Sequence, residues 1–172
     1  MLLPLVLLFL ADEHYQRGAD HFRNGRIQEA IAAFEEATRV APADARGWKG
    51  LGVAHASQGN YKSAEHPLRK ACEIDARDPD ACYYLGLASY NLGRYESALS
   101  AYNKALKGAV DVGRARAGLG LVLEALGKTE AAERELREAI KNASGKSRSP
   151  RRRIPRTRAG RQGAARLSAR AL

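Results

Sequence analysis

Apolar and polar positions along residues 11–146 follow the spacing of amphipathic helices, and glycines interrupt the pattern at regular intervals. Each glycine of the series Gly25, Gly59, Gly93 and Gly127 stands between two amphipathic stretches. This is the place for a residue that ends a helix with positive φ, which glycine tolerates best. We therefore predict helices near residues 12–24, 28–40, 45–58, 62–75, 79–92, 96–108, 113–126 and 130–142.

The whole pattern returns every 34 residues, in copies that span 11–44, 45–78, 79–112 and 113–146. Glycine or alanine fills four columns of the repeat completely: Gly18, Gly52, Gly86, Gly120; Gly25, Gly59, Gly93, Gly127; Ala30, Ala64, Ala98, Ala132; and Ala37, Ala71, Ala105, Ala139. Small side chains in the columns that contain Gly18, Ala30 and Ala37 allow neighbouring helices to approach closely. A further column holds the large side chains that fill the space beside those contacts: Phe34, Leu68, Tyr102 and Leu136.

A helix–turn–helix unit of 34 residues resembles the tetratricopeptide repeat. The second copy carries most of the residues typical of that family: Trp48, Leu51, Gly52, Ala54, Gly59, Tyr61, Ala64 and Ala71. The resemblance covers about residues 11–146. It implies an all-α fold, a right-handed superhelical solenoid of four hairpins with a concave groove. It also implies a non-catalytic scaffold that binds a peptide or subunit of another protein in that groove.

In this family the first helix of each hairpin lines the groove, so the resemblance also implies which side chains contact a partner. The candidate partner-binding residues are Tyr15, Phe22, Arg46, Lys49, Val53, Tyr83, Tyr84, Leu87, Tyr90, Asn91 and Arg114. Tyrosine and arginine are enriched at interface hot spots. Tyrosine rings beside cations suit an extended or helical peptide that bears an acid and an apolar anchor. The alternative interpretation is that the tyrosines only cover the contacts between hairpins.

No arrangement of side chains indicates catalysis, a cofactor or a metal. The Gly-Leu-Gly segments at 50–52 and 118–120 lack the lysine of a phosphate-binding loop, and the repeat already explains them. The histidines His14, His21 and His55 fall in core positions of the repeat. The first two lie about 10.5 Å apart along one helix, which is too far to share a metal ion. We expect no enzyme activity.

The two cysteines, Cys72 and Cys82, lie on consecutive predicted helices at nearly equal distances from the turn around Arg77. Their side chains could therefore face each other. One interpretation is a disulfide between the second and third hairpins, which would suit an exported protein. The other is a pair of small, buried, reduced residues.

Residues 1–10 are almost wholly apolar but too few to cross a bilayer, which takes about 20 residues in a helix. The segment resembles the apolar part of a secretory signal, although no Lys or Arg precedes it and Phe9 fits poorly before a cleavage after Ala11. If residues 1–11 are a signal, the protein is exported or periplasmic. If the segment instead packs on the first hairpin, or the start is wrongly set, we expect a cytoplasmic protein.

The net charge of +10 belongs to the C-terminal tail. Residues 147–172 contain nine arginines and no acid, whereas residues 1–146 hold 20 basic against 19 acidic side chains. We predict a disordered tail, with three interpretations. It binds nucleic acid or an anionic surface, it only solvates the chain, or it results from a shifted reading frame. A further alternative is that the chain is a regulatory fragment of a larger protein.

Overall fold

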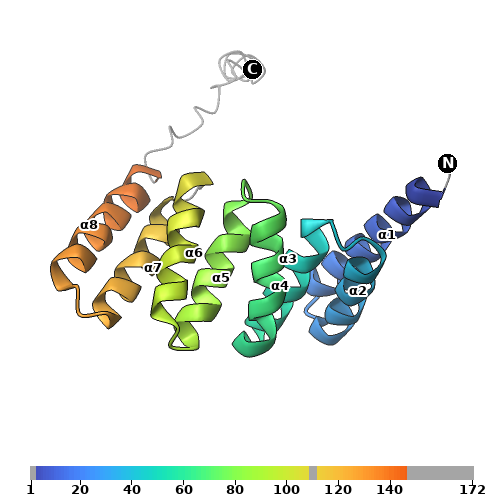
Figure 1. Cartoon of the computed structure of the whole chain (residues 1–172), viewed down its shortest axis with the longest axis horizontal. Coiled ribbons are helices and arrows are strands. Elements are labelled where there is room, and N and C mark those ends of the chain that lie inside the picture. Colours follow the sequence, from blue (N-terminus) through green and yellow to red (C-terminus); the bar gives the residue numbers. More distant parts are fainter. Residues whose placement is uncertain (1–2, 109–111, 147–172) are drawn as a thin grey trace, which may run out of the picture.

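The computed structural model describes residues 3–108 and 112–146, which form a row of helices that follows the order of the sequence (Figure 1). The helices are α1 (Leu3–Arg23), α2 (Ile27–Val40), α3 (Ala45–Ser57), α4 (Tyr61–Ile74), α5 (Pro79–Asn91), α6 (Tyr95–Gly108), α7 (Val112–Ala125) and α8 (Thr129–Lys146). The predicted eight helices are confirmed.

Two predicted boundaries were wrong, because α1 begins at Leu3 rather than near residue 12 and α8 continues to Lys146. Residues 3–10 are rich in leucine, a strong helix former. Pro4 does not interrupt the helix, because it lies in the first turn, where its missing N–H has no intrahelical partner to lose. The apolar N-terminal segment therefore continues α1 away from the row of hairpins (Figure 1).

The helices pair into hairpins, α1 with α2, α3 with α4, α5 with α6 and α7 with α8. Each turn is closed by a glycine of the predicted column, with φ between 70° and 75°. In the first turn the Gly25 amide donates to the Phe22 carbonyl at 3.0 Å and the Arg26 amide to the His21 carbonyl at 2.9 Å. This pair of bonds is the Schellman motif, and the other three turns repeat it. The glycine column therefore sets where each first helix ends.

Consecutive hairpins stack through α2 on α3, α4 on α5 and α6 on α7. The first helices of neighbouring hairpins also touch, as α1–α3, α3–α5 and α5–α7. Among the described residues no two second helices are in contact. The stack is therefore tighter on the side of α1, α3, α5 and α7, which form the inner layer of the solenoid.

Within each hairpin, the glycine column that contains Gly18 packs against the column of large side chains. A Cβ atom on Gly18 would lie 2.7 Å from the Phe34 ring, and one on Gly50 would lie 2.5 Å from it. The ring of α2 is thus held between glycines of α1 and α3, and Phe34 is almost fully buried. Small residues were predicted to bring helices together, and here they also make room for an aromatic ring.

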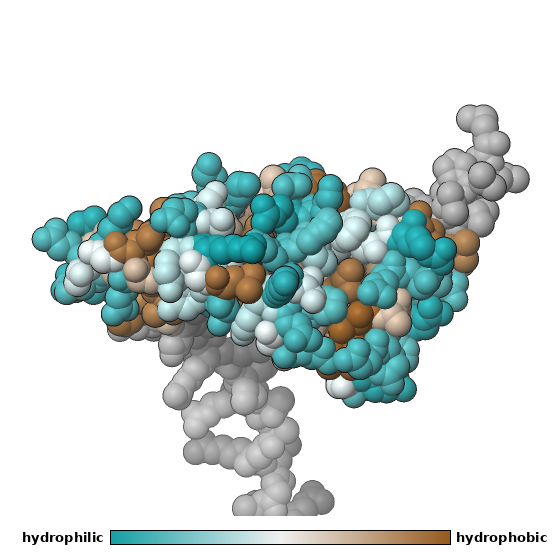
Figure 2. Space-filling model, turned by 60° about the horizontal axis from the view of Figure 1, so that its bottom comes forward, coloured by the Kyte–Doolittle hydropathy of each residue, from teal (hydrophilic) through white to brown (hydrophobic). Residues whose placement is uncertain are grey.

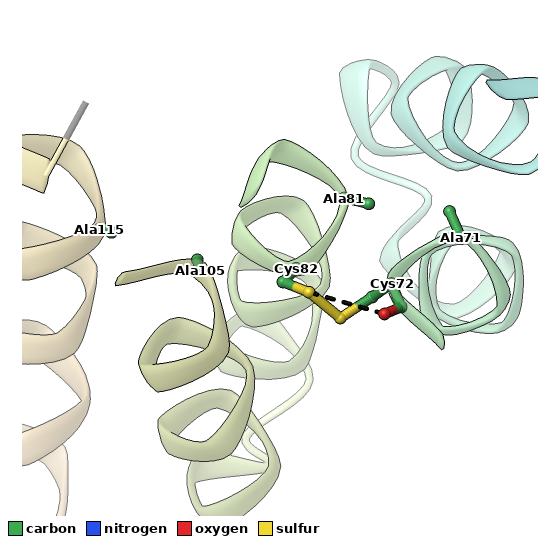
Figure 3. Close-up of a cluster of buried hydrophobic side chains, with 6 residues drawn as sticks. All are labelled: Ala71, Cys72, Ala81, Cys82, Ala105 and Ala115. Carbon is green, nitrogen blue, oxygen red and sulfur yellow. Dashed lines mark hydrogen bonds between the residues drawn. A yellow bond between two sulfur atoms is a disulfide. The ribbon is translucent and has the colours of Figure 1, made fainter. Parts of the chain in front are cut away.

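Cys72 of α4 and Cys82 of α5 form a disulfide, which decides between the two interpretations that the sequence leaves open. The bond joins the second hairpin to the third. Both cysteines are buried, with exposed fractions of 3% and 1%. Figure 3 shows them within a cluster of alanines from α4, α5, α6 and α7.

His14, His21 and His55 are each partly buried. None of the described helices combines the length and the apolar character that spanning a membrane requires. The predictions for the arginine-rich tail concern residues 147–172, which lie outside the described residues.

Candidate functional site

The inner layer contains a hollow of about 210 Å³ between α1, α3 and α5. Its surface is mostly apolar. Five of the candidate partner-binding residues line it: Tyr15, Phe22, Lys49, Val53 and Tyr84. On one face of the molecule, apolar side chains gather over the N-terminal half and polar ones border them (Figure 2). The repeat register thus brings side chains from three separate helices to one concave place.

Phe34 and Gly50 also line the hollow. The sequence analysis assigned Phe34 to packing alone, whereas the repeat register places Gly50 among the groove-facing positions of the second copy. The Phe34 ring comes from α2, passes under Gly50 and lies 5.9 Å from the Tyr15 ring. Any side chain at position 50 would occupy the space above that ring. The sequence contains a clue to this arrangement. Position 50 is a glycine, whereas the corresponding residues of the adjacent copies, Gln16 and Tyr84, have large side chains.

Two of the three candidate cations are neutralised by carboxylates of the chain itself. The Arg46 guanidinium lies 2.8 Å from Asp12 and 2.7 Å from Asp44, and 5.1 Å from the centre of the Tyr15 ring. Partial burial opposes ionisation of Asp44, but hydrogen bonds from the side chain and amide of Arg46 outweigh it and lower the pKa of Asp44. Lys49 forms an ion pair with Asp78. These cations therefore position α3 on its neighbours.

Arg114 of α7 is held differently. Its guanidinium lies 4.4 Å from the centre of the Tyr83 ring and 6.0 Å from that of Tyr84, a cation–π geometry. The two tyrosine rings pack edge to face with centres 5.3 Å apart. Hydrogen bonds to Tyr84 and Tyr83 raise the pKa of Arg114. Within the described part of the chain, no carboxylate forms an ion pair with Arg114.

Leu87, Tyr90 and Asn91 lie farther along α5 and do not line the hollow. The Tyr90 ring packs against the Tyr95 ring, with centres 5.8 Å apart. The Asn91 amide donates to the Leu87 carbonyl of its own helix at 2.8 Å. Most candidate residues thus fall into three groups. The first lines the hollow, the second is the stacked group of Tyr83, Tyr84 and Arg114, and the third is the outer group of Leu87, Tyr90 and Asn91.

The described residues contain no cluster of three or more His, Cys, Asp or Glu side chains that could hold a metal ion. The features that remain are an open inner face, an apolar hollow and stacked aromatic rings. They define a helical repeat protein with a surface suited to contact with another chain.

Comparison with known proteins identifies the family. A family model described as tetratricopeptide repeat matches residues 15–81, and one described as anaphase-promoting complex, cyclosome, subunit 3 matches residues 51–139. The chain belongs to the tetratricopeptide repeat proteins, which are typically non-catalytic scaffolds. No curated protein matches the sequence.

Solved structures show the same fold. The crystal structure of MamA superposes with a TM-score of 0.74 at 23% identity, covering 80% of each chain. A second MamA structure gives 0.73 at 22% identity, over 84% of this chain and 79% of that one. YrrB, described as a TPR protein with an unusual peptide-binding site, gives 0.70 at 23% identity, over 78% of this chain and 69% of that one.

Proposed function

We propose that this protein is a non-catalytic scaffold that binds a peptide segment of a partner protein along its inner face. The observation that carries the proposal is the apolar hollow between α1, α3 and α5. Concave, mostly apolar sites with a few polar groups at the edge are typical binding sites. The peptide-binding site named for YrrB, a protein of the same fold, adds support.

The residues around the hollow suit a side chain of the partner. Tyr15, Phe22 and Val53 supply apolar surface, and Asp80 and Arg23 supply charge at the edge. Aromatic rings offer a large contact area at little cost in side-chain entropy. An apolar side chain of a peptide would exchange water for these surfaces, while its backbone would remain near the polar edge.

The test starts from peptides selected on the immobilised full chain from a random phage-displayed library. The dissociation constants of selected, fluorescently labelled peptides are then measured by anisotropy with wild type, Val53→Lys and Ile74→Lys. Val53 lines the hollow, whereas Ile74 is an exposed residue at the end of α4 outside it. We expect Val53→Lys to weaken binding at least tenfold and Ile74→Lys to leave it unchanged. Equal effects of the two substitutions would disprove binding in the hollow.

A further inference from the structure

A longer period is superimposed on the 34-residue repeat, because several groove residues recur after two hairpins and not after one. Pairs separated by 68 residues are Asp12 and Asp80, Tyr15 and Tyr83, Arg46 and Arg114, and Gly50 and Gly118. The hairpin between the members of a pair has a different residue type at each of these positions. The groove is therefore built from a unit of two hairpins that occurs twice.

The two units share two contacts. In the first, Arg46 covers the Tyr15 ring at 5.1 Å and Gly50 lies over the Phe34 ring. In the second, Arg114 covers the Tyr83 ring at 4.4 Å. There, a Cβ atom on Gly118 would lie 2.4 Å from the Tyr102 ring. Each unit thus sets a cation-covered tyrosine beside an aromatic ring that passes under a glycine.

An aliphatic residue completes each unit on the inner face. Val53 lines the hollow of the first unit, and Leu121 takes the corresponding place in the second, 68 residues later. Leu121 is 44% exposed and is among the most exposed large apolar side chains of the described residues. An apolar side chain of a ligand would cover Leu121 in the same way as one in the first unit would cover Val53.

The two units differ in charge. Arg46 is paired with two carboxylates, whereas Arg114 lies over two tyrosine rings and forms no ion pair within the described residues. The carboxylate of Asp80, the counterpart of Asp12, lies at the edge of the first hollow. The cations of that hollow, Arg23 and Lys49, are already paired with Asp20 and Asp78. A ligand carboxylate should therefore be attracted more strongly at the second unit than at the first.

We propose that the groove has two corresponding subsites, one on α1 and α3 and one on α5 and α7, that together bind one extended peptide. The peptide carries a large apolar side chain for each subsite and a carboxylate beside the second. Packed helices lie about 8–10 Å apart, so two hairpin steps span about 20 Å, which an extended chain covers in about six residues. This proposal rests on the proposed function and adds the chemistry and spacing of the partner.

The probes are synthetic, fluorescein-labelled decapeptides of serine and asparagine that contain two phenylalanines. Their phenylalanines stand three or six positions apart, and single-phenylalanine versions replace one ring by serine. Two further versions of the six-position peptide carry one glutamate, either before the first phenylalanine or after the second. Both glutamate versions are needed because the experiment itself establishes in which direction the peptide lies along the groove.

Anisotropy titrations use the full-length chain and three variants, Val53→Lys, Leu121→Lys and Arg114→Gln, with Ile74→Lys as the matched surface control. We expect the six-position peptide to bind at least tenfold more tightly than the three-position and single-ring peptides. Val53→Lys and Leu121→Lys should each remove that advantage. One of the two glutamate versions should bind several-fold more tightly than the other, and Arg114→Gln should abolish the difference.

Equal binding of one-ring and two-ring peptides, or of both glutamate versions, would overturn the two-subsite inference. If Val53→Lys still weakened the library-selected peptides, the proposed function would stand without it. If no decapeptide bound at all, the inference would also fail. The proposed function would still be tested separately, by the binding of the library-selected peptides to the wild type and to Val53→Lys.

Discussion

Leu68 in α4 and Leu136 in α8 occupy the same column of the repeat but have different surroundings. Within its own hairpin each leucine packs against a glycine. A Cβ atom added to Gly52 would lie 2.5 Å from Leu68, and one added to Gly120 would lie 2.7 Å from Leu136. The outer face of α4 is covered by α5, which places Tyr84 against the Leu68 cluster. Within the described residues, α8 packs only on α7.

The next turn of each helix shows the same contrast. Cys72 is 3% exposed beneath α5, whereas its counterpart Ile140 is 66% exposed on α8. In a repeat array, the stability of each unit depends on the interface with its neighbour. The comparison therefore indicates that, within the described residues, neighbouring helices stabilise the second hairpin on two sides and the fourth on one.

The sharpest test of this contrast is the pair Leu68→Ala and Leu136→Ala. Leu68 is fully buried, so its truncation should cost about 2–5 kcal/mol through lost apolar burial and the cavity left behind. Leu136 is only partly buried, and the loss there should be clearly smaller. Urea unfolding followed by circular dichroism measures both. Equal losses would mean that another segment covers the outer face of α8.

The second test concerns the disulfide that joins the first two hairpins to the last two. The Cys72–Cys82 disulfide closes a short loop with a sequence separation of 10, for which the loop-entropy model gives about 2–3 kcal/mol. A phosphine reductant should therefore lower the urea midpoint of the wild type. The variant with both cysteines replaced by alanine should show the lower midpoint from the start and no response to reductant. An unchanged midpoint after complete reduction, verified by thiol titration, would contradict this account.

Much of the fold was predictable from the sequence, because the repeat requires small residues where helices touch and a glycine where each first helix ends. The register of a helical face follows from the same columns. For that reason Tyr15, Phe22 and Val53 could be assigned to the inner layer before the structure, and they line the hollow. Local geometry and periodicity were sufficient for these assignments.

Other features could not be predicted, because they depend on contacts between residues of different hairpins. The sequence does not show that Arg46 is neutralised by Asp12, 34 residues away, while Arg114 rests on tyrosine rings. The disulfide likewise required the relative placement of α4 and α5. Phe34 was assigned to packing alone, since its position under Gly50 arises only when the second hairpin stacks on the first.

The smallest expected effect is a pH dependence of stability caused by Tyr102, whose counterpart in the first half of the chain is Phe34. This effect is absent at neutral pH. Burial raises the pKa of Tyr102 above its ordinary value of 10.0. In the unfolded chain this phenol loses its proton near pH 10, whereas in the folded chain it keeps the proton to higher pH. The stabilisation is therefore complete below pH 10 and is lost as the pH rises, by at most about 1.4 kcal/mol per pH unit.

Substitution Tyr102→Phe should remove this part of the alkaline destabilisation, and the reciprocal Phe34→Tyr should introduce it in the first half. The measurement is the free energy of unfolding in urea between pH 8 and 11 for the wild type and both variants. Parallel pH profiles for the wild type and Tyr102→Phe would show that the phenol reaches water in the folded protein. Because Gly118 lies over Tyr102 as Gly50 lies over Phe34, that result would also show that the second subsite is more open than the first.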